Sequence, residues 1–190
     1  KKKWGLKLIS IASLIQYRHQ RDQLIEKFSE SEFPTEFGQF KLHAFRSILD
    51  GRVHYALTMG KISARSSTLV RVQTADVLSD ALGLETVKGR LRSVDQALKA
   101  ISAKGSGALL YMEPRRAEEL QKNEPSSPEP DETNPLSSPK MDFRDYGIGA
   151  QVLAALGIKK LSLLSRDRRK VVGLEGYGLE ITEYVLLSKK

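Results

Sequence analysis

Cysteine is absent from the sequence. None occurs in 190 residues, so no disulfide can form and no metal can be held by thiolates. Aromatic residues are few, at 7%, while 40% of the residues are hydrophobic, which is ordinary for a soluble globular protein. The length allows one domain with a substantial core and some additional segments, or two small domains.

A long apolar run is also missing. Residues 1–28 begin with three lysines and a short apolar stretch, but Lys7 interrupts it and no small-residue cleavage site of a secretory signal follows. Because the stretch is too short to cross a bilayer, we expect no membrane association. We also expect a cytoplasmic location, with which the absence of cysteine agrees. Its apolar residues fall at helical spacing behind Ser10 and predict an amphipathic helix reaching Phe28. The chain begins without methionine, which suggests a fragment of a longer polypeptide.

Histidine and clustered charge are scarce as well. The three histidines, His19, His43 and His54, show no metal-ligand spacing, and each is expected to be exposed or half-buried. The net charge of +8 comes from basic residues spread along the chain rather than gathered with aromatic residues. Nucleic acid is therefore not the expected partner, whereas a nucleotide phosphate would suit this charge.

The periodicity predicts a mixed α/β domain with a β-rich first half. Strand-like runs fill residues 34–74, with turns at Asp50-Gly51 and Gly60-Lys61. Further on, the pattern predicts in order a helix at 93–103, a buried strand at 108–112, a helix at 147–156 stopped by Gly157, a strand at 160–164, a polar turn at 165–170 and a short helical run through 171–174.

The polar turn is the best candidate for a ligand site. In an open α/β sheet, ligands bind where the chain leaves the carboxyl end of a strand, and a hydroxyl and cations beside a helix start suit a phosphate. The predicted anion site consists of Ser165, Arg168, Arg169 and Lys170.

The surrounding string carries a family resemblance. DFRDYGIGAQVLAALGIKKLSLL, followed by GLEGYGLEI, resembles the carboxyl-terminal half of GTP cyclohydrolase II, an enzyme of riboflavin synthesis. The resemblance implies that family's mixed-sheet α/β fold, a homodimer and a GTP or phosphate ligand. It also implies a proton acceptor at Asp142, a nucleophile at Arg144, and nucleotide-binding groups at Arg71, Ser165 and Lys170.

The beginning of the chain carries a second resemblance. WGLKLISIASLIQYR is similar to the end of 3,4-dihydroxy-2-butanone 4-phosphate synthase, which precedes a cyclohydrolase II module in many bacterial polypeptides. The two resemblances imply that residues 1–28 are the tail of a synthase domain plus a linker helix, that residues 34–190 form a cyclohydrolase-like domain, and that the upstream synthase domain is a partner.

The chain departs from the cyclohydrolase pattern at the zinc site. The family has R-V-H-S-E-C, then G-D, then C-x-C, whereas this chain has RVQTADVLSDALGLETVKG from Arg71. Asp76 stands at the first cysteine, and Val87 and Gly89 fall near the other two. One carboxylate cannot replace three soft thiolates, so no zinc or other cofactor is expected.

Two further segments depart from the pattern. The family's glycine-rich Q-E-G-R-G-I-G-L is replaced by EPRRAEEL, which contains Pro114 and no glycine, although Arg115 and Arg116 can still attract an anion. Residues 123–140 are rich in proline, serine and acidic residues, which predicts a mobile acidic loop. This loop is either a docking motif or a segment whose sequence is no longer constrained by the family's active site.

Three hypotheses follow. The first is a cyclohydrolase-like module without activity that serves assembly, stability or regulation of the attached synthase. The second is a working cyclohydrolase with another metal arrangement, and the third is a nucleotide or metabolite sensor. Asp142 and Arg144 would bind a nucleotide in the third case, or would otherwise form an ion pair or cap at the start of a helix.

Overall fold

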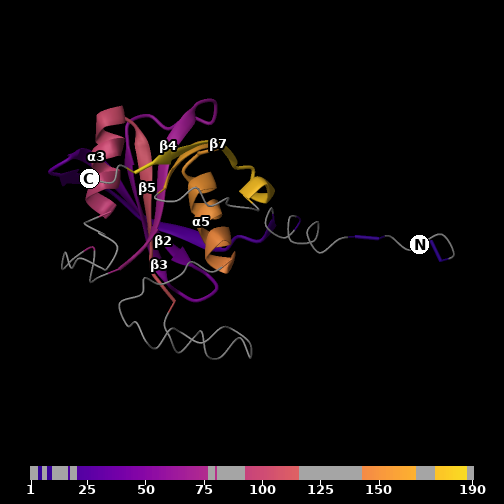
Figure 1. Cartoon of the computed structure of the whole chain (residues 1–190). Helices are drawn as coiled ribbons and strands as arrows, with labels where there is room; N and C mark the ends of the chain where they lie inside the picture. The colour runs from indigo at the N-terminus through magenta and orange to yellow at the C-terminus, as the bar shows by residue number, and fades with distance from the viewer. Residues whose placement is uncertain are drawn as a thin grey trace, which may run out of the picture.

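The computed structural model describes residues 4–5, 8–9, 17, 21–76, 80, 93–115, 143–165 and 174–187. Within these residues a single mixed sheet of seven strands is flanked by helices (Figure 1). The strands are β1 (Ile25–Thr35), β2 (Gly38–Ser47), β3 (Val53–Met59), β4 (Ser67–Thr74), β5 (Gly107–Met112), β6 (Lys160–Ser165) and β7 (Glu180–Leu186). The helices are α3 (Ser93–Lys104), α5 (Phe143–Ala155) and the 3-10 turn η1 (Leu174–Tyr177).

The strand order is β1-β2-β3-β5-β4-β6-β7. The first four strands in this order pair antiparallel, whereas β5-β4, β4-β6 and β6-β7 are parallel pairs. Parallel neighbours end at the same edge of a sheet, so residues at the carboxyl ends of β4, β5 and β6 are brought close together. Of the positions that the sequence singled out, this edge carries Ser165 at the end of β6 and Arg115 shortly after β5.

The central strand β5 separates two parts of the core. Because successive side chains of a strand point to opposite faces, Ala108, Leu110 and Met112 pack in one buried cluster with α5, and Leu109 packs in another with α3. Nearly every residue of β5 is buried, as the uninterrupted apolar run GALLYM predicts for a strand covered on both faces.

The β-rich first half is confirmed in residues 34–74, including the hairpin turn at Asp50-Gly51. Gly51 has a φ of 73°, which favours glycine. The prediction that a helix reaches Phe28 is wrong, because Ile25 to Phe28 already belong to strand β1. Strand β1 pairs with β2 from Ile25 to Thr35, and this long-range pairing overrides the local helical spacing. Most of residues 1–20 lie outside the described residues.

The two helices and the later strands agree with the predicted pattern. Helix α3 ends before Gly105 and α5 before Gly157, and both glycines have a positive φ. Helix α5 begins at Phe143, four residues before the expected start, and the last helical run is the short 3-10 turn η1. The predicted acidic loop at 123–140 and most of the polar turn at 165–170 lie outside the described residues. Among the described helices, none has the length and apolar character needed to span a membrane.

Candidate functional site

A buried ionic network joins the start of β3, the end of β5 and the start of α5. Its centre is Arg52, whose side chain is only 5% exposed. The guanidinium donates from Nη2 to Oδ1 of Asp145 at 2.7 Å, from Nε to Oδ2 of Asp50 at 2.8 Å, and from Nη1 to the carbonyl of Glu113 at 2.8 Å. Charge-assisted bonds of this kind are strong where water is excluded. The network therefore holds three chain segments together at one edge of the sheet.

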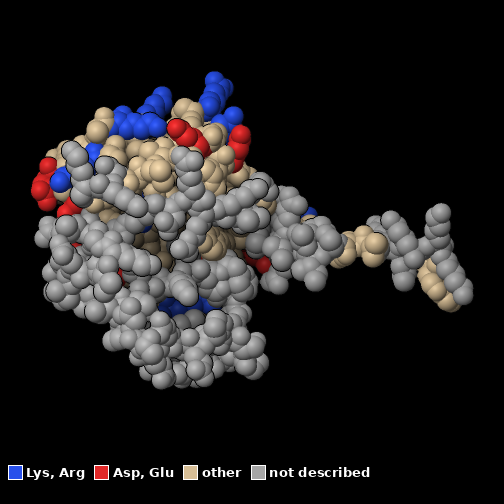
Figure 2. Space-filling model, viewed as in Figure 1, with Lys and Arg blue, Asp and Glu red and all other residues tan. Residues whose placement is uncertain are grey.

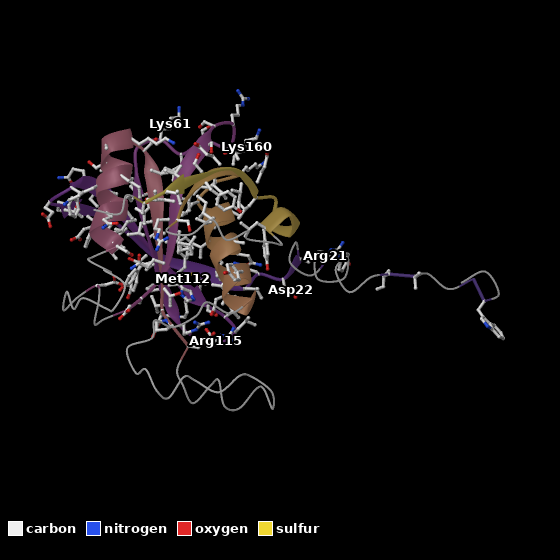
Figure 3. All side chains as sticks on the ribbon, in the orientation of Figure 1. Arg21, Asp22, Lys61, Met112, Arg115 and Lys160 are labelled. Carbon is white, nitrogen blue, oxygen red and sulfur yellow. The ribbon has the colours of Figure 1, made fainter. Side chains whose placement is uncertain are left out.

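Two further contacts complete this network. The Nε of Arg115 lies 3.4 Å from Oδ1 of Asp145, and the Glu113 carboxylate accepts a hydrogen bond of 2.9 Å from the amide of Val53. Figure 3 shows Arg115 at the lower end of the sheet, beyond Met112 at the end of β5. Lys61 and Lys160 lie at the opposite, upper end, where the cations on the visible face of Figure 2 also gather.

The network fixes the helix start at which the motif residues lie. Arg144 is in the first turn of α5, directly before Asp145. The side chain of Arg144 and the whole of Asp142 lie outside the described residues, so their predicted roles stay predictions. Sequence reasoning did not single out Arg52 or Asp145. Asp145 stands within the quoted D-x-R-D-Y string, but Arg52 is 93 residues away and has no local signal that links the two.

Two of the predicted nucleotide-binding positions come together. Arg71 on β4 donates from Nη1 to the carbonyl of Leu164 on β6 at 3.1 Å, and Ser165 follows as the last residue of β6. The two strands pair in parallel through Val70 and Leu163, which places Arg71 and Ser165 toward the same edge. Lys170, with Arg168 and Arg169, lies outside the described residues.

A second polar cluster includes Asp76, where the resemblance places the first zinc ligand, whereas Val87 and Gly89 lie outside the described residues. The Asp80 carboxylate is the acceptor in this cluster. Its Oδ1 accepts a hydrogen bond from Nε2 of Gln73 at 2.8 Å, and its Oδ2 accepts from the Tyr111 hydroxyl at 3.0 Å and from the amide of Asp76 at 3.1 Å. The hydroxyl of buried Ser93 donates to Oε1 of Gln73. Burial, followed by the bond to Asp80, raises the pKa of the Tyr111 phenol, so it stays a proton donor.

This donor set does not fit a tightly bound zinc ion. Zinc in structural sites prefers four ligands drawn from thiolates and imidazoles, and the chain has no cysteine. Within the described part of the chain, no three residues among histidine, aspartate and glutamate are grouped so that they could hold a metal. Both oxygens of Asp80 already accept hydrogen bonds, and a bound cation would have to displace their donors.

The expectation that the histidines are exposed or half-buried is wrong for two of them. His43 and His54 are 6% and 0% exposed, because each lies on an inner strand of the sheet. His43 bonds Thr58 Oγ1 at 2.9 Å, and Nδ1 of His54 accepts from the amide of Glu113 at 3.2 Å. Burial lowers the pKa of both imidazoles, so the neutral form is favoured.

An open groove of about 590 Å³ lies on another side of α5, beside the segment that leads into β1. Its walls include Arg21 and Asp22 from that segment, Phe45 from β2, Gln151 from α5 and Tyr177 from η1. Figure 3 shows Arg21 and Asp22 at this side of the helix. The groove is therefore formed where the preceding segment meets the sheet domain.

The sequence and the fold together place the chain in a known class. The sequence profile of the GTP cyclohydrolase II family matches residues 26–186, and the chain belongs to this family. The chain is 40% identical over 195 residues to riboflavin biosynthesis protein RibBA of Aquifex aeolicus, an alignment that covers 97% of this chain and 47% of that protein. It is 37% identical over 186 residues to the 3,4-dihydroxy-2-butanone 4-phosphate synthase of Photobacterium phosphoreum, covering 97% and 49%.

The fold agrees with a solved structure. The crystal structure of RibBX, a two domain 3,4-dihydroxy-2-butanone 4-phosphate synthase from A. baumannii, matches with a TM-score of 0.57 and 24% sequence identity. The match covers 100% of this chain and 47% of that one. The predicted mixed-sheet fold of the cyclohydrolase II family is thus confirmed. This chain spans about half the length of the curated relatives that it matches.

Proposed function

We propose that this chain is a cyclohydrolase II-type module of a riboflavin biosynthesis protein that lacks cyclohydrolase activity. In this proposal it serves the assembly, stability or regulation of an attached 3,4-dihydroxy-2-butanone 4-phosphate synthase. The names of the relatives support the pathway, since RibBA is a riboflavin biosynthesis protein. The Photobacterium relative and the RibBX structure are named for the synthase alone, which supports the role of such a module beside a synthase.

The hydrogen-bonded cluster around Asp80 carries the proposal. In the region where the family pattern has its ligands, the carboxylate is engaged by Gln73, Tyr111 and the amide of Asp76. Opening the imidazole ring of GTP requires attack by water at a carbon atom, and a metal makes water nucleophilic at neutral pH by lowering its pKa. A carboxylate engaged by hydrogen-bond donors does not by itself supply this effect. Loss of about 5 kcal/mol of transition-state stabilisation slows a reaction by more than a thousandfold.

A GTP turnover assay tests this proposal. The purified chain is incubated with GTP and Zn²⁺, and released formate is measured beside a zinc-containing cyclohydrolase II as a positive control. We expect no formate above the rate without enzyme. Formate release by this chain, together with one bound zinc per chain, would favour a working cyclohydrolase with another metal arrangement and would overturn the proposal.

The supporting role is tested in the two-domain protein. The synthase domain is expressed with and without this module, and its activity, thermal unfolding and molar mass in solution are compared. We expect the synthase without the module to be less active, less stable or differently assembled. Equal behaviour in all three measurements would contradict the supporting role, whatever the outcome of the GTP assay. The molar mass also tests the predicted homodimer.

A nucleotide sensor is the second candidate, favoured by the contact between Arg71 and the end of β6. This contact keeps a guanidinium beside Ser165, at the edge where phosphate groups bind in related sheets. Calorimetry with GTP tests it, using Arg144→Ala and Lys170→Ala, with Lys61→Ala as a control at the far end of the sheet. The sensor requires binding that the first two changes weaken and the control leaves unchanged. If GTP does not bind the unmutated chain, the sensor hypothesis fails.

A further inference from the structure

The side chain of Gln151 on α5 bonds the backbone of the segment that precedes β1. Its Oε1 accepts from the amide of Leu24 at 2.8 Å, and its Nε2 donates to the carbonyl of Asp22 at 2.7 Å. In an extended chain, the carbonyl of one residue and the amide two residues later point to the same side. One primary amide, with its donor and its acceptor, therefore satisfies both groups as a neighbouring strand would.

The segment is also held from the sheet. The carbonyl of Leu24 accepts a hydrogen bond of 2.9 Å from the amide of Ile48, just after β2. Residues 22–24 are thus bonded both to α5 and to the turn that follows β2. Both bonds of Gln151 are made to backbone groups, so they define the path of the segment independently of its side chains.

The position of Gln151 on α5 connects this contact with the candidate site. It lies on the same helix as Asp145, six residues further along the chain. The segment that leads into the domain is consequently bonded to the same helix whose first turn is fixed by Arg52 and Asp145.

We propose that Gln151 is the docking residue that fixes the preceding segment to α5, and with it the orientation of the domain that this segment connects. This inference rests on the proposed function, because it names the contact through which the module would act on an attached domain. The partner is the preceding part of the same polypeptide, recognised by its backbone at Asp22 and Leu24.

Hydrogen exchange of the Leu24 amide tests the docking. Gln151→Met keeps the length of the side chain and removes both bonds, and Gln151→Glu keeps the acceptor for Leu24 but loses the donor to Asp22. The control is Gln23→Ala, because Gln23 bonds only the carbonyl of Ile25 among the contacts described for it. We expect exchange at Leu24 to rise by roughly tenfold or more in Gln151→Met, and to change little in the control.

A distance measurement provides the second test. Because the chain has no cysteine, spin labels attach only to cysteines introduced at Tyr17, which is 54% exposed, and at exposed Lys160. We expect a narrow distance distribution in the parent chain and in Gln23→Ala, and a broader one in Gln151→Met and Gln151→Glu. If Gln151→Met does not fold, Gln151→Glu carries this test alone.

The outcomes separate the two proposals. Unchanged distances in the folded Gln151 variants, together with unchanged Leu24 exchange in folded Gln151→Met, would overturn the docking role and leave the proposed function intact. Formate release by the unmutated chain would overturn the proposed function and leave the hydrogen bonds of Gln151 as they are.

Discussion

Loss of the Arg52 side chain should be the most damaging single change at the edge of the sheet. Arg52 and Asp145 have side chains that are 5% and 10% exposed, and their atoms are 2.7 Å apart. Replacement by methionine keeps much of the apolar stem but removes every donor to Asp50, Asp145 and Glu113. Nε of Arg115 would then remain 3.4 Å from Oδ1 of Asp145.

The expected cost follows from the burial. Removing one partner of a buried ion pair typically destabilises a protein by about 3–5 kcal/mol, because a charge is left in a poorly solvated place. This is a large part of the about 5–15 kcal/mol that separates most folded domains from their unfolded chains. The exposed pair Lys160 and Glu180 provides a control, since its atoms are 3.7 Å apart and its side chains are 47% and 64% exposed. Such pairs contribute about 0–1 kcal/mol.

Urea unfolding of a double-mutant cycle measures the interaction. Arg52→Met, Asp145→Asn and the double variant are compared, and the same cycle is made with Lys160→Met and Glu180→Gln. We expect a coupling free energy of about 2 kcal/mol or more for the buried pair and less than about 0.5 kcal/mol for the exposed pair. Equal, small couplings in the two cycles would refute the claim that this network fixes the start of α5.

Three further changes test other parts of the structure. Burial lowers the pKa of His54 in the folded chain, whereas the imidazole of the unfolded chain titrates at about 6.5. As the pH drops below that value, the unfolded chain binds the proton first, so the free energy of unfolding should decrease. In urea titrations at several pH values, His54→Gln should make this dependence on pH shallower. Burial alone would raise the pKa of Asp50, but hydrogen bonds, including those from Arg52, outweigh it and lower the pKa. The Asp50 carboxylate therefore contributes to the free energy of unfolding above about pH 4, and this contribution is lost at lower pH. An acid-unfolding transition that is unchanged in Asp50→Asn would contradict this. A Cβ added to Gly147 would lie 2.5 Å from the Tyr177 hydroxyl, so Gly147→Ala should destabilise the fold by about 1–3 kcal/mol through overpacking. In thermal unfolding, adding Tyr177→Phe should restore most of this stability. If it restores none, the clash is not the cause.

The sequence predicted the centre of the sheet well because the local pattern there is unambiguous. The run at 108–112 is uniformly apolar, and the helices before Gly105 and Gly157 end where a positive φ is needed. The start of β1 was missed because Leu24, Ile25 and Phe28 fall at helical spacing, while the strand is created by pairing with residues about twenty positions later. Long-range pairing of this kind leaves no trace in local periodicity.

The candidate site was predictable only in part, for a related reason. The D-x-R-D-Y string drew attention to this segment, although the helix was expected from 147 and α5 begins at Phe143, and the missing cysteines drew attention to the altered metal region. The residues that organise these two places, Arg52 and Asp80, act through partners on other elements. An isolated arginine before a strand or an aspartate in a polar stretch is usually a solvated charge, and only the fold shows that these two are surrounded by donors and acceptors.

The zinc content of the purified chain is the most direct test of the central claim. The chain is equilibrated with an excess of Zn²⁺, dialysed, and measured by elemental analysis beside the Asp80→Asn variant. The hydrogen-bonded cluster predicts far less than one zinc per chain and no difference between the two proteins. One tightly retained zinc per chain that is lost in Asp80→Asn would contradict the account.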